Sequence, residues 1–72
     1  MGFEFAVDLR DGSIVPANYD MLRRIGFYIA KGDSVRLGPF AVHLYLMRKN
    51  GHFVLLIRIE RVLDLRFLGA EE

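Results

Sequence analysis

The dipeptide Asn50-Gly51, flanked on both sides by alternating apolar residues, constrains the fold of this chain more than any other stretch. Asn-Gly is typical of a type I′ turn, because both central positions of that turn need a positive φ. The sequence therefore predicts a β-hairpin whose register is fixed by the turn. The predicted cross-strand pairs are Arg48–Phe53, Leu46–Leu55, Leu44–Ile57 and Val42–Ile59 on one face, and Met47–Val54, Tyr45–Leu56, His43–Arg58 and Ala41–Glu60 on the other.

The two faces of this hairpin differ in polarity. The first is apolar along its length and is extended by Phe40, with Arg48 beside the turn as its one charge. The second is apolar only beside the turn and polar at the far end, where His43, Arg58 and Glu60 lie. An antiparallel sheet usually buries one face and leaves the other in water. We therefore expect the fully apolar face to be covered.

Odd-numbered residues stay apolar beyond the hairpin as far as Phe67, with Arg61 as the exception. One strand of that length exceeds the usual 3–10 residues, so the pattern predicts a reversal near Arg61. A three-residue loop over 60–62 keeps apolar residues opposite one another and sets Asp64 opposite Arg58, a favourable pair. A long strand bent at Arg61 is the alternative.

The first third of the chain predicts a strand and a helix. Residues 3–10 alternate as a strand, which the turn dipeptide Asp11-Gly12 closes. Asn18 suits a helix N-cap, and Gly32 suits a helix end, so we expect a helix over about 19–31. Its predicted buried stripe is Leu22, Ile25, Gly26 and Ile29.

These elements predict an α+β fold. It consists of a mainly antiparallel sheet, formed by the strand 3–10 and a meander over about 34–68, with the helix 19–31 packed on one face. The expected contact face of the helix holds Leu44, Leu46, Leu55 and Ile57. With 72 residues, we expect a single small domain spanning 1–72.

Composition narrows the chemistry. The chain has no cysteine, which excludes disulfides, thiolate catalysis and sulfur-ligated metals. It has no phosphate loop, metal-ligand spacing or nucleophile motif, so we expect no catalytic residue, metal, cofactor or small-molecule ligand. It shows no signal peptide or membrane-spanning run, which favours a cytoplasmic protein without membrane contact. The absence of Gln and Cys is compatible with a thermophilic source.

The 53% hydrophobic share is high for so small a chain, and this indicates contact with a partner. We expect a non-enzymatic interaction module that forms a homodimer or binds another protein through the apolar end of the second hairpin face. Phe27 lies among arginines on the polar side of the predicted helix, as a contact anchor, as an isolated surface residue or as a residue covered by the N-terminal segment. The predicted interface residues are Met47, Val54, Tyr45, Leu56, Leu68 and Phe27.

Nucleic-acid binding is a second hypothesis. The net charge is only +1, and the arginines are spread over several predicted surfaces, whereas phosphate binding needs one basic stripe. The group His43, Arg58 and Asp64 has the residue types for acid–base chemistry on a phosphodiester, but we interpret it as structural. The residues of this possible polar or nucleic-acid site are His43, Arg58, Asp64, Arg66, Arg23 and Arg24.

A third hypothesis comes from a family resemblance. The expected meander reads VHLYLMR over 42–48, HFVLLIRIE over 52–60 and VLDLRFL over 62–68. With the preceding strand and helix, it resembles the C-terminal half of RelE/ParE-type toxins, over about half the chain. The resemblance implies a minimal toxin-type ribonuclease. The chain departs from that family in having one predicted helix in place of a helical hairpin. It also lacks the family's cluster of basic catalytic residues beyond Arg58 and Arg66.

Overall fold

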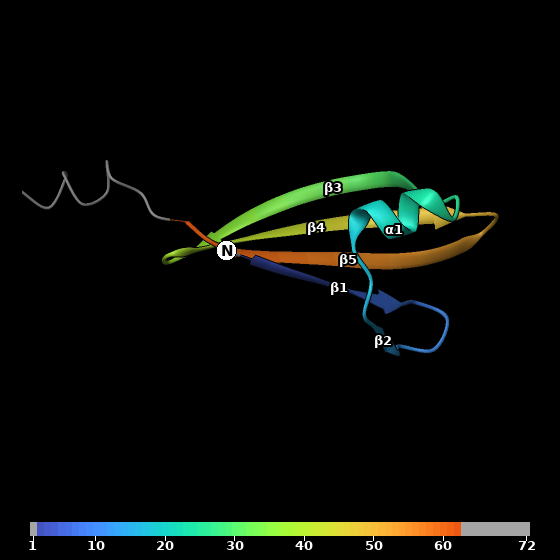
Figure 1. The fold of residues 1–72 in the computed structure, drawn as a ribbon, viewed down its shortest axis with the longest axis horizontal. Helices are drawn as coiled ribbons and strands as arrows, with labels where there is room; N and C mark the ends of the chain where they lie inside the picture. The colour runs from blue at the N-terminus through green and yellow to red at the C-terminus, as the bar shows by residue number, and fades with distance from the viewer. Residues whose placement is uncertain (1, 63–72) are drawn as a thin grey trace, which may run out of the picture.

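The computed structural model describes residues 2–62, which form five strands and one short helix (Figure 1). The strands make one antiparallel sheet in the order β2-β1-β5-β4-β3. The described part of the chain is therefore mainly β, and of the α+β prediction the antiparallel sheet is confirmed. The elements are β1 (Gly2–Asp8), β2 (Ile14–Val15), α1 (Tyr19–Arg24), β3 (Tyr28–Leu37), β4 (Phe40–Lys49) and β5 (His52–Arg61).

The predicted hairpin is β4 and β5, joined at Asn50-Gly51. Both turn residues have positive φ, 47° for Asn50 and 78° for Gly51, as a type I′ turn requires. Every cross-strand pair predicted from the turn is present, from Arg48–Phe53 to Ala41–Glu60. The local turn sequence and the alternation were therefore sufficient to predict this register.

The other side of β5 is occupied by β1. Phe3 pairs with Ile59 and Phe5 with Ile57, while β2 pairs back onto β1 after the turn at Gly12. β1 and β4 therefore flank β5 on both sides, and Glu60 and Arg61, which were predicted in a loop, belong to β5. Glu4 and His43 lie opposite Arg58, whereas Asp64, the residue predicted there, lies outside the described residues. Residues 63–68 themselves lie outside the described residues.

The helix is shorter than predicted. Its start is correct, since the Asn18 side chain accepts a hydrogen bond from the Met21 N–H. It ends at Arg24, because Gly26 adopts a φ of 106° and so stops the helix. Residues 28–31, predicted as helix, belong to β3, and all of them except Ala30 pair with β4. Of the predicted buried stripe only Leu22 is buried, and Ile25 and Ile29 are exposed.

The buried core lies on one face of the sheet, which we call the helix-side face. Met47 and Leu56 are fully buried there, beside α1 and the chain that follows it. Figure 1 shows α1 at the end of the sheet where β4 turns into β5. The core residues are Ala6, Ala17, Leu22, Phe27, Met47, Val54 and Leu56, with Tyr19 and Tyr45 packed against them.

The prediction that the helix covers Leu44, Leu46, Leu55 and Ile57 is therefore wrong. These residues alternate with Met47, Val54 and Leu56 along β4 and β5, so they lie on the other face. A helix of six residues is about 9 Å long, whereas a ten-residue strand is about 33 Å long. So short a helix matches the short apolar end of the helix-side face, and the polar remainder of that face needs no cover.

Candidate association surface

The face of the sheet away from α1, which we call the opposite face, is apolar across the strands. Strand pairing assigns its residues, because directly paired residues of antiparallel strands share a face. Phe5, Ile57 and Leu44 form one row across it, and Phe3, Ile59, Val42 and Val35 form the next. Its apolar residues are Phe3, Phe5, Val7, Ile14, Val35, Leu37, Phe40, Val42, Leu44, Leu46, Phe53, Leu55, Ile57 and Ile59.

No side chain of the opposite face is buried, and within residues 2–62 no element lies over it. Phe3 is 59% exposed and Leu37 59% exposed, whereas the residues in its middle are half-buried by their neighbours within the sheet. Within the described residues, the charged side chains assigned to this face lie at its margin. Lys31 and Asp33 follow the β3 edge, and Arg48 and Arg61 lie at the two ends. The described residues therefore leave this broad apolar face uncovered.

The predicted interface residues lie elsewhere. Met47, Val54, Leu56 and Phe27 are buried in the core, and Tyr45 is half-buried against them, so they offer no surface to a partner. Leu68 lies outside the described residues. Phe27 was placed on the polar side of a helix that in fact ends before it. Its ring packs edge-on against His52, with 5.3 Å between the ring centroids.

The polar end of the helix-side face holds two of the predicted site residues, His43 and Arg58. The His43 Nδ1 lies 2.8 Å from the Ser34 Oγ, and its Nε2 lies 3.4 Å from the Glu60 Oε1. Arg58 approaches the same Glu60 oxygen at 3.8 Å. Asp64, the third member predicted, lies outside the described residues. Ser34 and Glu60 were not predicted; the hairpin register already placed Glu60 two residues beyond Arg58, whereas Ser34 required the register of β3.

The predicted basic residues do not share one surface. Arg23 belongs to α1, and its guanidinium lies 5.7 Å from the Tyr19 ring centroid and 4.8 Å from that of Tyr28. Arg24 is beside it in sequence, at the same end of the sheet. Arg58 lies towards the other end, opposite Glu4, and Arg66 lies outside the described residues. Arg23, Arg24 and Arg58 therefore do not form the basic stripe that phosphate binding favours.

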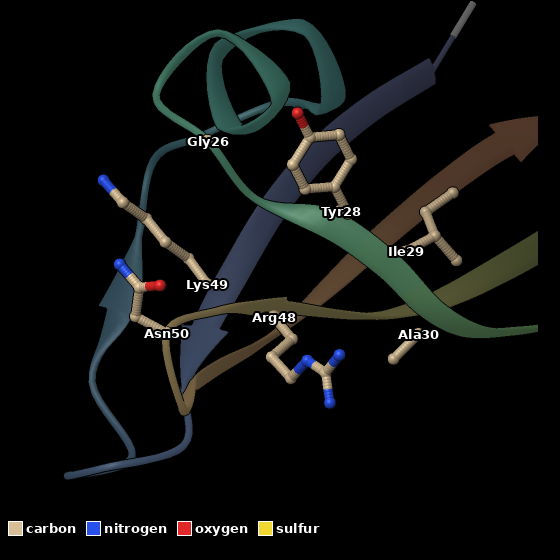
Figure 2. A pocket seen from close by; sticks show the side chains of 7 residues that line it. All are labelled: Gly26, Tyr28, Ile29, Ala30, Arg48, Lys49 and Asn50. Carbon is tan, nitrogen blue, oxygen red and sulfur yellow. The ribbon is translucent and has the colours of Figure 1, made fainter.

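A shallow hollow of about 300 Å³ lies where the end of the helix segment meets the hairpin turn. Figure 2 shows that the Arg48 side chain points away from Tyr28, whereas Lys49 extends towards Gly26. The two cations diverge, and a binding pocket needs polar groups that converge on a ligand. The hollow is lined by Gly26, Tyr28, Ile29, Ala30, Arg48, Lys49 and Asn50.

Asp8 connects the end of β1 to the start of β5. Its carboxylate accepts the Arg10 N–H at 2.9 Å and lies 3.0 Å from the His52 Nε2. The hydrogen bond from the Arg10 backbone, helped by His52, lowers the pKa of Asp8 from its ordinary value of 3.8.

This depressed pKa predicts a pH dependence of stability. A carboxylate with a lowered folded-state pKa stabilises the fold above its unfolded pKa, and the contribution is lost as the pH falls through the folded-state value. We expect Asp8→Asn to lower the denaturation midpoint near neutral pH and to differ less from the wild type below pH 3.8. Urea unfolding at a series of pH values measures this. An equal difference at every pH would contradict the role of the ionised carboxylate.

Among residues 2–62, no group of three or more His, Cys, Asp or Glu side chains is arranged to hold a metal ion. In the same part of the chain, no helix is long and apolar enough to cross a membrane.

Comparison with protein-family models, with curated proteins and with solved structures gives no match to this chain. The resemblance to RelE/ParE-type toxins therefore has no support from these comparisons.

Proposed function

We propose that this chain is a self-associating interaction module, in which the opposite face packs against the same face of a second copy. The observation that carries the proposal is an apolar sheet face without one buried side chain. A folded chain with a single covered face normally has a polar second face. The proposal keeps the self-association expected from composition, but it assigns the interface to the opposite face and not to the helix-side face.

The size of the face suits a specific interface. Three strands of ten residues and β1 of seven, spaced about 4.8 Å apart and rising about 3.3 Å per residue, span about 600 Å². Two such faces together cover about 1,200 Å², the lower end of the range for specific protein interfaces. Apolar patches left on monomers seldom exceed about 600 Å², so the face is at the limit of what a monomer exposes.

A second copy fits this surface well because of its shape and its charges. Two identical sheets have the same twist and pack face to face about 10 Å apart, as in a β-sandwich. A two-fold axis lets one patch serve both copies. Charge repulsion does not oppose the contact in the middle of the face, because Lys31, Asp33, Arg48 and Arg61 stand at its margin.

Glutamate substitutions in the middle of the face test the proposal. Ile57 and Leu44 are cross-strand partners there, and neither is part of the buried core. We expect Ile57→Glu and Leu44→Glu each to give a folded protein whose solution mass falls to that of one chain at low micromolar concentration. Light scattering after size exclusion measures the mass, and circular dichroism confirms the fold.

The matched control is Ile25→Glu, since Ile25 is 51% exposed and lies in the segment after α1, away from the opposite face. It should keep the mass of the wild type. A wild-type protein that stays monomeric at high micromolar concentration would overturn the proposal. Dimerisation that appears only after deletion of residues 63–72 would instead assign the cover of this face to the end of the chain.

A further inference from the structure

A second surface of the sheet has an open row of backbone groups. β3 is the edge strand beside β4, and all ten of its residues are exposed. The other edge is the two-residue strand β2, which pairs only with Ala6 and Val7 of β1, so residues 2–5 form a second but shorter open edge. A long exposed edge presents N–H and C=O groups on which another strand can pair.

Ser34 shows which backbone groups of β3 point outward. Its N–H donates to its neighbour's side chain, the Asp33 Oδ1, at 2.8 Å. In an antiparallel pair, the backbone groups of successive residues point alternately towards and away from the neighbouring strand. The N–H and C=O groups of Ser34 and of Gly32 therefore point to the free side of β3.

The irregularity of β3 limits how another strand can pair with it. The pairing with β4 shifts register between Ile29 and Lys31 and is regular from Lys31 to Leu37. Such a bulge bends an edge and interrupts pairing. An added strand therefore has the stretch 31–37 to use, and Ser34 is its middle residue.

We propose that the β3 edge pairs with β3 of a second copy, antiparallel and centred on Ser34, so that two sheets join edge to edge. Self-pairing over the whole regular stretch must be centred on its middle residue. This register sets Asp33 opposite Val35 and Lys31 opposite Leu37 of the second copy, so no like charges face one another. Centring on Asp33 would set two carboxylates face to face, which is unfavourable.

This contact goes beyond the proposed function, because it uses the edge of the sheet and leaves the opposite face free. The two-fold axis stands perpendicular to the sheet, so the opposite faces of both copies lie on the same side of the joined sheet. Copies that also associate through those faces form assemblies larger than a dimer. The hydrogen bond from the Ser34 N–H to Asp33 must open for the strands to pair, so Asp33 opposes the contact.

A single cysteine tests the register, since the chain has no native cysteine. At the centre of the pairing, the two Ser34 Cα atoms are about 5.5 Å apart, within the span of a disulfide. Ser34→Cys should therefore form an intermolecular disulfide under mild oxidation roughly tenfold or more faster than Asp33→Cys, because a formed pair raises the effective concentration of the thiols. The two Asp33 residues are displaced along the strands by about 6.6 Å, which puts them beyond disulfide reach. Equal rates for the two variants would overturn the register.

A matched pair of backbone variants tests the contact itself. Ser34→Pro removes an N–H that β4 does not use, whereas Ser34→Ala keeps it, and both remove the Ser34 hydroxyl that contacts His43. We expect the proline variant alone to lose the species larger than a dimer, while circular dichroism shows that both keep the sheet. Large species that persist with proline would contradict edge pairing.

The Ile57→Glu background separates this contact from association through the opposite face. There, disulfide formation by Ser34→Cys should still exceed that by Asp33→Cys at high protein concentration. If Ile57→Glu leaves the solution mass unchanged while this difference persists, the face contact fails and the edge contact stands. If the difference is absent in both backgrounds, the edge contact fails whatever the mass.

Discussion

Leu56→Ala is expected to lower the free energy of unfolding by about 2–5 kcal/mol, the range for truncating a fully buried leucine. Leu56 has no exposed surface and lies between Ala6 and Tyr45 on the neighbouring strands. Its truncation leaves a cavity in the core that the flanking strands cannot close without breaking their pairing. Chemical denaturation monitored by circular dichroism measures the loss.

The control is the next residue, Ile57, whose side chain lies on the opposite face. Ile57→Ala should cost about 1 kcal/mol or less, because the site stays open to water in a single chain. Both variants are best measured in the Leu44→Glu background, where association through the opposite face does not add to the stability. A larger loss for Ile57→Ala than for Leu56→Ala would mean that the core lies on the other face.

The sequence predicted the hairpin because all of its determinants are local. Asn50-Gly51 specifies the turn type, and the alternation around it specifies the partner of each residue from Arg48 to Ala41. The N-cap at Asn18 and the turn at Gly12 were predictable for the same reason. Each depends on the chemistry of one to three neighbouring residues.

The hairpin sequence alone does not show which of its two faces the rest of the chain covers. Both faces are apolar near the turn, and the decision depends on the length and position of the covering segment. An expected helix over 19–31 is long enough to cover an apolar face, whereas the observed helix stops at Arg24. The face was predicted from its apolar character alone, and α1 is too short to cover it. The residues predicted for the interface were taken from the other face, where the structure buries Met47, Val54 and Leu56.

Of the predicted polar group His43, Arg58 and Asp64, the hairpin places only the first two. His43 and Arg58 are brought together by the hairpin register alone. The third member, Asp64, was predicted from the alternation of residues beyond Arg61. In the structure Glu4 of β1 lies beside Arg58, and that alternation gives no sign of the pairing between β1 and β5. Sequence alternation assigns residues to faces, but the order of strands in a sheet depends on long-range pairing.

The segment after the helix also explains why Phe27 was misinterpreted. On a helix continuing to Lys31, Phe27 falls among the arginines and becomes a candidate contact anchor. In the structure the positive φ of Gly26 turns the chain, and the Phe27 N–H bonds to the Leu22 carbonyl at 2.9 Å. The side chain is 4% exposed and belongs to the core.

Phe27→Ala is therefore expected to destabilise the fold by about 3–5 kcal/mol, the range for removing a buried phenylalanine. The ring closes the core at the hairpin end, where it contacts His52, and no other aromatic side chain belongs to the buried cluster of the described residues. Ile25→Ala is the matched control, since Ile25 is 51% exposed two residues earlier, and it should change stability by no more than about 0.5 kcal/mol. Denaturant unfolding compares the two. A contact anchor would give the reverse pattern, in which Phe27→Ala leaves the denaturation midpoint unchanged and weakens association. That result would mean that the Phe27 side chain is exposed and that the path of the chain after Gly26 differs from the one described above.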